Sequence, residues 1–173
     1  MPRPIRYQQR YELSPARLFA TLVDREFLEA KLASIGGQNA VVLDLATTLG
    51  TDADSAKCTL RQGVGRQDLP TPVQKVLRGD LIIERTETWR ATGPDRYDGT
   101  IAARVKDAPG TIRGTLRVFG NPAPDSPSAE FSVNGEVKVD IPLVGGKIEE
   151  AIAEQVVRLL RREGRFALEW LAR

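Results

Sequence analysis

Glu163 is the residue whose type and position most directly suggest chemistry. It lies in the middle of an apolar helical pattern, one turn after Leu159 and one turn before Phe166. A carboxylate on a buried surface needs a partner, because burying an unpaired charge is unfavourable. In a functional interpretation, Glu163 anchors the polar end of a ligand or is an acid of raised pKa facing a cavity. In a structural one, it pairs with a buried arginine, or a helix break at Gly164 turns it to solvent.

The stretch ERTETW at residues 84–89 places charged and aromatic side chains together. Arg85, Glu87 and Trp89 share one face of a predicted strand, because alternate residues of a strand point the same way. If this face is turned inward, the guanidinium and the carboxylate form a polar floor beside an aromatic wall. Such a floor suits an acidic or hydroxylated ligand. The alternative is cross-strand salt bridging on the convex surface of the sheet.

Histidine is absent from the chain, and this excludes several catalytic classes. Ser-His-Asp and Cys-His nucleophile pairs, the His-Glu-x-x-His zinc helix and imidazole acid–base chemistry all require it. Cys58 is the single cysteine, so intrachain disulfides and cysteine-based zinc sites are excluded too. Any catalysis would use carboxylates, tyrosine, lysine, arginine or Cys58. The GVG at 63–65 and the Asp52/Asp54 pair do not complete a dinucleotide or calcium motif, so we expect no cofactor and no metal.

The composition is that of an ordinary globular protein. The 173 residues are 41% hydrophobic and 28% charged, with a formal net charge of +2. The charges are interspersed, which argues against a nucleic-acid partner. The apolar runs are far shorter than the roughly 20 residues that cross a bilayer, and no signal-peptide pattern is present. We therefore predict a cytoplasmic protein without stable membrane insertion. The arginines at 158–165 could rest on an anionic membrane, but glutamates on the same helix face favour a solvated surface.

The N-terminal quarter of the chain predicts one strand and two short helices. Residues 5–13 alternate apolar and polar side chains, which is the period of a strand with one buried face. Tyr7 and Tyr11 have the inward parity of this strand, either as hydrogen-bond donors to a ligand or as core residues. A Ser-Pro pair at 14–15 is typical of a helix start, and a glycine pair at 36–37 is typical of a helix end.

From residue 41 onward the pattern is almost entirely that of strands. Residues 69–80, which contain two prolines, predict a loop with a single helical turn and the most mobile flap. The Asn134-Gly135 pair predicts a hairpin turn or, as the parity on its two sides favours, a glycine bulge in one continuous strand. Six strands are predicted in this part of the chain: 41–48, 56–64, 81–91, 97–106, 111–119 and 129–141.

After a glycine pair at 145–146, one long helical pattern extends from Lys147 to about Leu171. At 1.5 Å per residue such a helix is over about 35 Å long. A strongly twisted antiparallel sheet offers a concave surface that can bury its apolar stripe. The predicted fold class is therefore α+β, a helix-grip fold in which one strongly curved antiparallel sheet of about seven strands wraps around the C-terminal helix, with two short helices between strands one and two. The stripe contains eight apolar residues: Ile148, Ile152, Val156, Leu159, Leu160, Phe166, Ala167 and Trp170.

Small residues on the inner face of the predicted sheet indicate a cavity beneath the helix. Cys58, Gly99, Ala103, Gly114 and Gly135 leave space that leucine or phenylalanine would fill. The alternative is that the glycines only let the sheet coil, with the helix packed flush against it. If the cavity exists, its candidate ligand-binding residues are Tyr7, Tyr11, Cys58, Leu60, Arg85, Glu87, Trp89, Ile101, Ala103, Leu116, Phe131, Val133, Val156, Leu159, Glu163 and Phe166.

Several stretches carry a family resemblance: LP at 69–70, GDLIIERTETW at 79–89, GTLRV at 114–118 and above all GEVKVDIPLVGGKIEEAI at 135–152. With the order of elements, the chain resembles the START and polyketide-cyclase (SRPBCC) superfamily, and within it an uncharacterised actinobacterial family. The resemblance covers essentially the whole chain and implies one START-like domain over residues 1–173. Superfamily members hold lipids, sterols, polyketides or hormones between sheet and helix, and some are cyclases or hydrolases. The narrower family brings no catalytic residues.

The expected function is binding or carriage of a hydrophobic small molecule with one polar end, such as a lipid, an isoprenoid or a polyketide-like compound. A second interpretation is a cyclase-, aromatase- or hydratase-type enzyme that positions a flexible substrate, with Glu163, Glu87 or a tyrosine moving protons. A third is a protein-interaction adaptor with a solid core. An open cavity would exclude the adaptor. Ligand identity and oligomeric state do not follow from the sequence.

Overall fold

The computed structural model describes residues 2–173, which form seven strands, four α-helices and one 3-10 helix. In chain order these elements are β1 (Arg3–Tyr11), α1 (Pro15–Leu22), α2 (Arg25–Ile35), β2 (Val41–Thr48), β3 (Ser55–Val64), η1 (Arg66–Asp68), α3 (Thr71–Gln74), β4 (Leu81–Gly93), β5 (Arg96–Val105), β6 (Gly110–Asn121), β7 (Ser128–Val139) and α4 (Gly145–Leu171).

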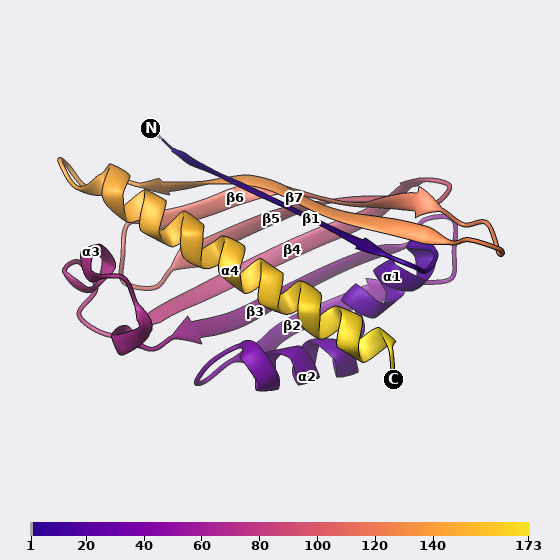
Figure 1. Ribbon diagram of the computed structural model, residues 1–173, viewed down its shortest axis with the longest axis horizontal. Coiled ribbons are helices and arrows are strands. Elements are labelled where there is room, and N and C mark those ends of the chain that lie inside the picture. Colours follow the sequence, from indigo (N-terminus) through magenta and orange to yellow (C-terminus); the bar gives the residue numbers. More distant parts are fainter. Residues whose placement is uncertain (1) are drawn as a thin grey trace.

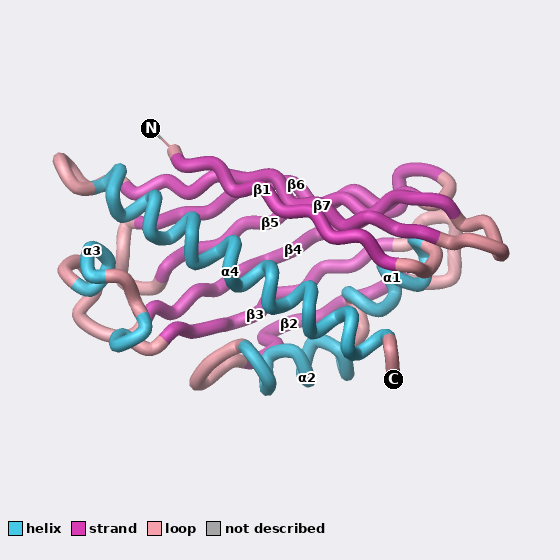
Figure 2. Tube along the Cα trace, viewed as in Figure 1, coloured by secondary structure: helices cyan, strands magenta, loops and turns pink. Residues whose placement is uncertain are grey.

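The seven strands form one antiparallel sheet in the order β1-β7-β6-β5-β4-β3-β2. Strand β1 lies at the edge of the sheet beside β7, so five strands separate it in the sheet from β2, the next strand along the chain. Figure 1 shows α4 crossing the sheet diagonally, with its C-terminal end beside α1 and α2. The expected helix-grip fold, with two short helices between strands one and two, is confirmed. Figure 2 shows the same arrangement by secondary structure, with α3 near the opposite end of α4.

The two short helices begin where the sequence provides caps. The Ser14 side chain accepts a hydrogen bond from the backbone N–H of Arg17, and Pro15 occupies the first turn of α1. Asp24 accepts one from the backbone N–H of Phe27 at 2.9 Å. Such caps satisfy backbone donors that have no partner within the helix. Helix α1 packs against β5, β6 and β7, and α2 packs against β2 and α4.

The Asn134-Gly135 pair does not form the bulge that we expected. Strand β7 is continuous, and its register with both neighbours passes through Gly135 without a shift. Gly135 lies opposite Gly114 of β6. A Cβ added to Gly114 would lie only 2.5 Å from the backbone oxygen of Asn134. The two glycines therefore allow close contact between strands, and no extra residue is needed. The register shifts lie elsewhere, at 42–44 of β2 and at 91–93 of β4.

Helix α4 packs along β1 and β7 and also contacts α2 and α3. Four residues of the predicted stripe are buried, namely Ile148, Ile152, Leu160 and Ala167. The other four are only partly buried: Val156, Leu159, Phe166 and Trp170. The sheet and the other helices thus cover only half of the predicted stripe completely. Among residues 2–173, no helix is long and apolar enough to cross a membrane.

Candidate functional site

Two small cavities lie between the sheet and α4. The first, of about 40 Å³, is enclosed by α2, the C-terminal half of α4 and the central strands, and the second, of about 30 Å³, lies further along α4. Each has room for a few water molecules, since one water needs roughly 10–15 Å³ of such volume. Ligand sites for drug-sized molecules are typically about 300–1,000 Å³. Arg85, Ile101, Val133 and Leu160 line both cavities, so the two are neighbours separated by side chains.

Twelve of the sixteen candidate residues line one or both cavities: Tyr11, Arg85, Glu87, Trp89, Ile101, Ala103, Leu116, Phe131, Val133, Val156, Leu159 and Glu163. The structure places the other four outside both cavities. Cys58 and Leu60 are buried in the sheet core under neighbouring side chains. Tyr7 directs its hydroxyl toward the backbone of α4 at Gly164. Phe166 stacks on Trp170 and packs against Phe27 of α2.

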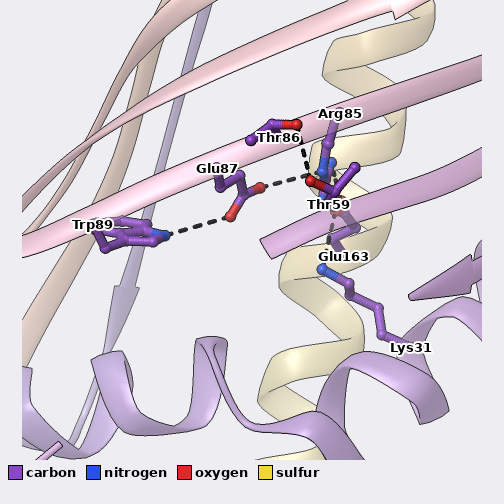
Figure 3. A network of polar contacts seen from close by, with 7 residues as sticks. All are labelled: Lys31, Thr59, Arg85, Thr86, Glu87, Trp89 and Glu163. Carbon is purple, nitrogen blue, oxygen red and sulfur yellow. Dashed lines mark hydrogen bonds and ion pairs between the residues drawn. The ribbon is translucent and has the colours of Figure 1, made fainter. Parts of the chain in front are cut away.

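Glu163 forms a buried ion pair with two cations. Its Oε2 accepts a hydrogen bond of 3.0 Å from Arg85 Nη2, and its Oε1 forms an ion pair with Arg85 Nη1 at 2.7 Å. Lys31 of α2 lies on the other side, with Nζ 3.6 Å from Oε2. Figure 3 shows the three side chains meeting between sheet, α2 and α4. Helix α4 continues through Gly164 without a break. Of the alternatives for Glu163, the structure therefore shows the buried ion pair.

The two cations determine the protonation state of Glu163. Burial by itself would raise the pKa of this carboxyl, but the charges of Arg85 and Lys31 outweigh burial and lower the pKa to about 2. Glu163 is therefore ionised at neutral pH. A carboxylate held in this way has no proton to donate, so the raised-pKa acid that we considered from the sequence is not supported.

Arg85, Glu87 and Trp89 all face inward, as one of the two interpretations of β4 required. Glu87 Oε1 lies 3.2 Å from Arg85 Nε, and its Oε2 accepts a long hydrogen bond of 3.4 Å from Trp89 Nε1 (Figure 3). On the opposite face, Thr59 and Thr86 hydrogen-bond to each other across β3 and β4. Strand β4 thus contributes Arg85 and Glu87 to the polar lining of the first cavity.

Cys58 lies beside this floor but is chemically inert at neutral pH. Burial, together with the nearby charge of Glu87, raises the pKa of its thiol to about 12. The thiolate is the nucleophilic form of cysteine, and it is negligible so far below the pKa. Among residues 2–173, no group of three or more Cys, Asp or Glu side chains is arranged to hold a metal ion.

Tyr7 and Gly164 fit each other closely. The Tyr7 hydroxyl is buried without a hydrogen-bond partner in the described chain, and a Cβ added to Gly164 would overlap its oxygen. Burial, and then the charge of Glu163, raises the pKa of Tyr7, which therefore stays protonated. A glycine in a helix interior is unfavourable by roughly 1 kcal/mol relative to alanine. The close approach of Tyr7 explains why glycine occupies this position in α4.

This fit predicts non-additive mutations at positions 7 and 164. Gly164→Ala should destabilise the protein by about 1–3 kcal/mol through overpacking. Tyr7→Phe should be nearly neutral, because it removes a hydroxyl that has no partner. In the double variant the nearest atom to the new Cβ is the ring carbon at 3.3 Å, so most of the loss should disappear. Urea unfolding of the four proteins measures the coupling, and additive effects would contradict the contact.

Lys31, Glu149 and Gln62 are among the buried polar residues that were not identified from the sequence. Lys31 lies on the apolar face of α2 with Phe27, and its four-residue spacing from Phe27 was the available signal. Glu149 accepts a hydrogen bond from the backbone N–H of Val139 at 2.9 Å and so caps the end of β7. Gln62 lines the second cavity, and its side-chain nitrogen has no partner in the described chain. Alternation on β3 could have identified Gln62 as inward-facing.

Comparison with known sequences gives a family and several relatives that match nearly the whole chain. A family model described as a protein of unknown function, DUF2505, matches residues 6–171. Uncharacterised proteins of Mycobacterium tuberculosis and Mycobacterium bovis are each 30% identical to this chain over 173 residues, which is 99% of this chain and 98% of each relative.

Comparison with solved structures concerns the fold alone. A conserved protein from Geobacillus kaustophilus has a TM-score of 0.51 at 10% identity, over 96% of both chains. A START superfamily protein from Mycobacterium smegmatis has a TM-score of 0.46 at 15% identity, over 97% of this chain and 98% of the other. At such identities, residue roles cannot be transferred between the chains.

Proposed function

The chain belongs to the DUF2505 family, the uncharacterised family that its sequence resembles, and we propose that it binds a hydrophobic small molecule with one polar end between the sheet and α4. The observation that carries this proposal is the meeting of two apolar-lined cavities at a buried polar cluster. Apolar walls supply affinity in proportion to the area that they cover, and a few polar groups fix the ligand's orientation.

The walls of the site come from elements far apart in the sequence. Ile101, Leu116 and Val133 belong to three adjacent strands, and Leu160 belongs to the facing helix. Phe27 and Trp89 close the first cavity from α2 and β4. Such a set of side chains is suited to an aliphatic or flat polycyclic body, because it offers contact and no hydrogen bonds. The polar cluster of Lys31, Arg85, Glu87 and Glu163 lies at one side of this apolar space.

A ligand of lipid or polyketide size requires the site to expand. The cavities hold only about 40 and 30 Å³, so binding must displace side chains or move a helix. Leu160 is the residue of α4 that borders both cavities. Phe27, Phe166 and Trp170 pack together with ring centroids 5.7–6.0 Å apart, and they fasten α2 to α4. We infer that the ligand enters where this aromatic contact opens and takes the place of Leu160.

Leu160→Ala tests this account, because it removes a buried apolar side chain that borders both cavities. The empty variant should lose about 2–5 kcal/mol of unfolding free energy, as buried leucine truncations do. Hydrophobic ligands should then stabilise the variant more than the wild type, since they fill the space that the mutation leaves. Thermal shift with fatty acids, isoprenoids and polyketides measures both effects.

Leu168→Ala is the matched control, because Leu168 lies on the same helix with 43% of its surface exposed. It should change neither stability nor ligand response appreciably. If no hydrophobic compound raises the melting temperature of the wild type or of Leu160→Ala, the proposed function is wrong. The solid-core adaptor would then be the better interpretation.

A further inference from the structure

Four charged side chains meet at the first cavity and balance one another. Lys31 and Arg85 supply two positive charges, and Glu87 and Glu163 supply two negative ones. The exposed fractions of these side chains are 8%, 7%, 15% and 9% in that order. Arg113 is the other charged residue that borders either cavity, and it is exposed to solvent. The buried polar cluster therefore carries no net charge.

Each of the three guanidinium nitrogens of Arg85 already faces a carboxylate oxygen. Its two terminal nitrogens form the paired contacts with Glu163 at 2.7 and 3.0 Å, and its Nε faces Glu87 at 3.2 Å. A paired fork of this kind is the usual way in which arginine binds a carboxylate. The position that a ligand carboxylate would take on Arg85 is already filled by Glu163.

Lys31 borders the first cavity, pairs with no second carboxylate among residues 2–173 and has unused hydrogen-bonding capacity. An ammonium has three N–H donors. The carboxylate oxygen that pairs with it, Oε2 of Glu163, lies 3.6 Å away, beyond ordinary hydrogen-bond distance. The residue is buried and borders the first cavity, so its remaining donors can serve an acceptor placed there. Glu87 also borders this cavity, and its weakly bonded Oε2 can accept from a hydroxyl.

Resting on the proposed function, we propose that the polar end of the ligand is uncharged, and that it is a hydroxyl, ketone or ester oxygen that accepts a hydrogen bond from Lys31. A ligand carboxylate would place three anions against two cations in a buried site. A ligand ammonium would place three cations against two anions. Each leaves one unpaired buried charge, which is far less favourable than a neutral hydrogen-bonding group.

Three probes of equal chain length test the charge preference: 1-octanol, octanoate and octylammonium at pH 7. Isothermal titration of the wild type should give a Kd for octanol at least about tenfold lower than for either ion, because an unpaired buried charge is unfavourable by more than the 1.4 kcal/mol that corresponds to tenfold. Equal or tighter binding of octanoate would overturn the inference and leave the proposed function standing. If none of the three binds, both fail.

Two variants should change the preference in opposite directions. Glu87→Gln leaves the cluster with one excess positive charge, so the affinity for octanoate should rise about tenfold relative to the affinity for octanol. Lys31→Gln leaves one excess negative charge, so the affinity for octylammonium should rise relative to that for octanol. Octanol itself should bind more weakly, because the glutamine side chain is shorter than lysine and its N–H donor reaches less far. Unchanged preferences in folded variants would overturn the inference. If a variant does not fold, the wild-type comparison of the three probes still decides.

Discussion

Ile152→Asp should leave the protein unfolded at room temperature. Ile152 lies in the first half of α4 and is only 4% exposed, within the core that joins the helix to the sheet. The substitution removes its hydrophobic burial and places a carboxylate where no cation is available among the buried residues of this part of α4. Loss of burial alone is about 1.5–3 kcal/mol, and an unpaired buried charge adds several more. Together these approach the whole stability of a typical domain.

Leu168→Asp is the matched control for this prediction. It makes the same kind of change on the same helix, at a side chain that is 43% exposed. Circular dichroism and urea unfolding should show a folded control and an unfolded or strongly destabilised Ile152→Asp. If both variants have the same urea midpoint of unfolding as the wild type, Ile152 does not hold α4 against the sheet, and the helix-grip packing is wrong.

Glu163→Gln should be the second most damaging substitution. It keeps the shape of the side chain but leaves Arg85 and Lys31 with Glu87 as the remaining carboxylate of the cluster. Breaking a buried ion pair from one side typically lowers stability by about 3–5 kcal/mol. Glu169→Gln is the control, since Glu169 is exposed on the same helix. Urea unfolding at pH 7 compares the three proteins.

Acid should reduce the difference between wild type and Glu163→Gln. The folded-state pKa of Glu163 is about 2, below the ordinary value of 4.5. A group with a lowered pKa stabilises the folded state fully above its unfolded pKa, and this contribution falls as the pH drops from about 4.5 to about 2. The gap in unfolding free energy between the two proteins should therefore be smaller at pH 3 than at pH 7. An equal gap at both pH values would contradict the lowered pKa.

The elements that depend on local pattern could be predicted from the sequence. Alternation identified the strands, the Ser-Pro pair identified the start of α1, and a helical pattern from Lys147 to about Leu171 identified α4, which begins two residues earlier at Gly145. The error at Gly135 has a physical reason, because a glycine in a strand indicates either a bulge or a close backbone approach. The sequence does not say that Gly114 lies opposite, since register across the sheet is a property of the fold.

The candidate site could be predicted only in part. The inward parity of Arg85, Glu87 and Trp89 follows from alternation once the buried face is known. The pairing of Glu163 with Arg85 and Lys31 depends on how α2, β4 and α4 meet, over sequence separations that no local pattern reports. The small size of the cavities could not be predicted either, because it depends on how closely the side chains of α4 pack onto the sheet.

Native mass spectrometry of the protein purified gently from its own host tests the central claim most directly. The account predicts a discrete added mass that disappears after organic extraction and returns when the extract is added back. Rebinding should also stabilise the extracted protein, by about 2.7 kcal/mol at a ligand concentration one hundred times Kd. A single mass equal to that of the bare chain in every preparation, with no stabilisation by the host's hydrophobic extract, would contradict the claim that this protein binds a hydrophobic small molecule.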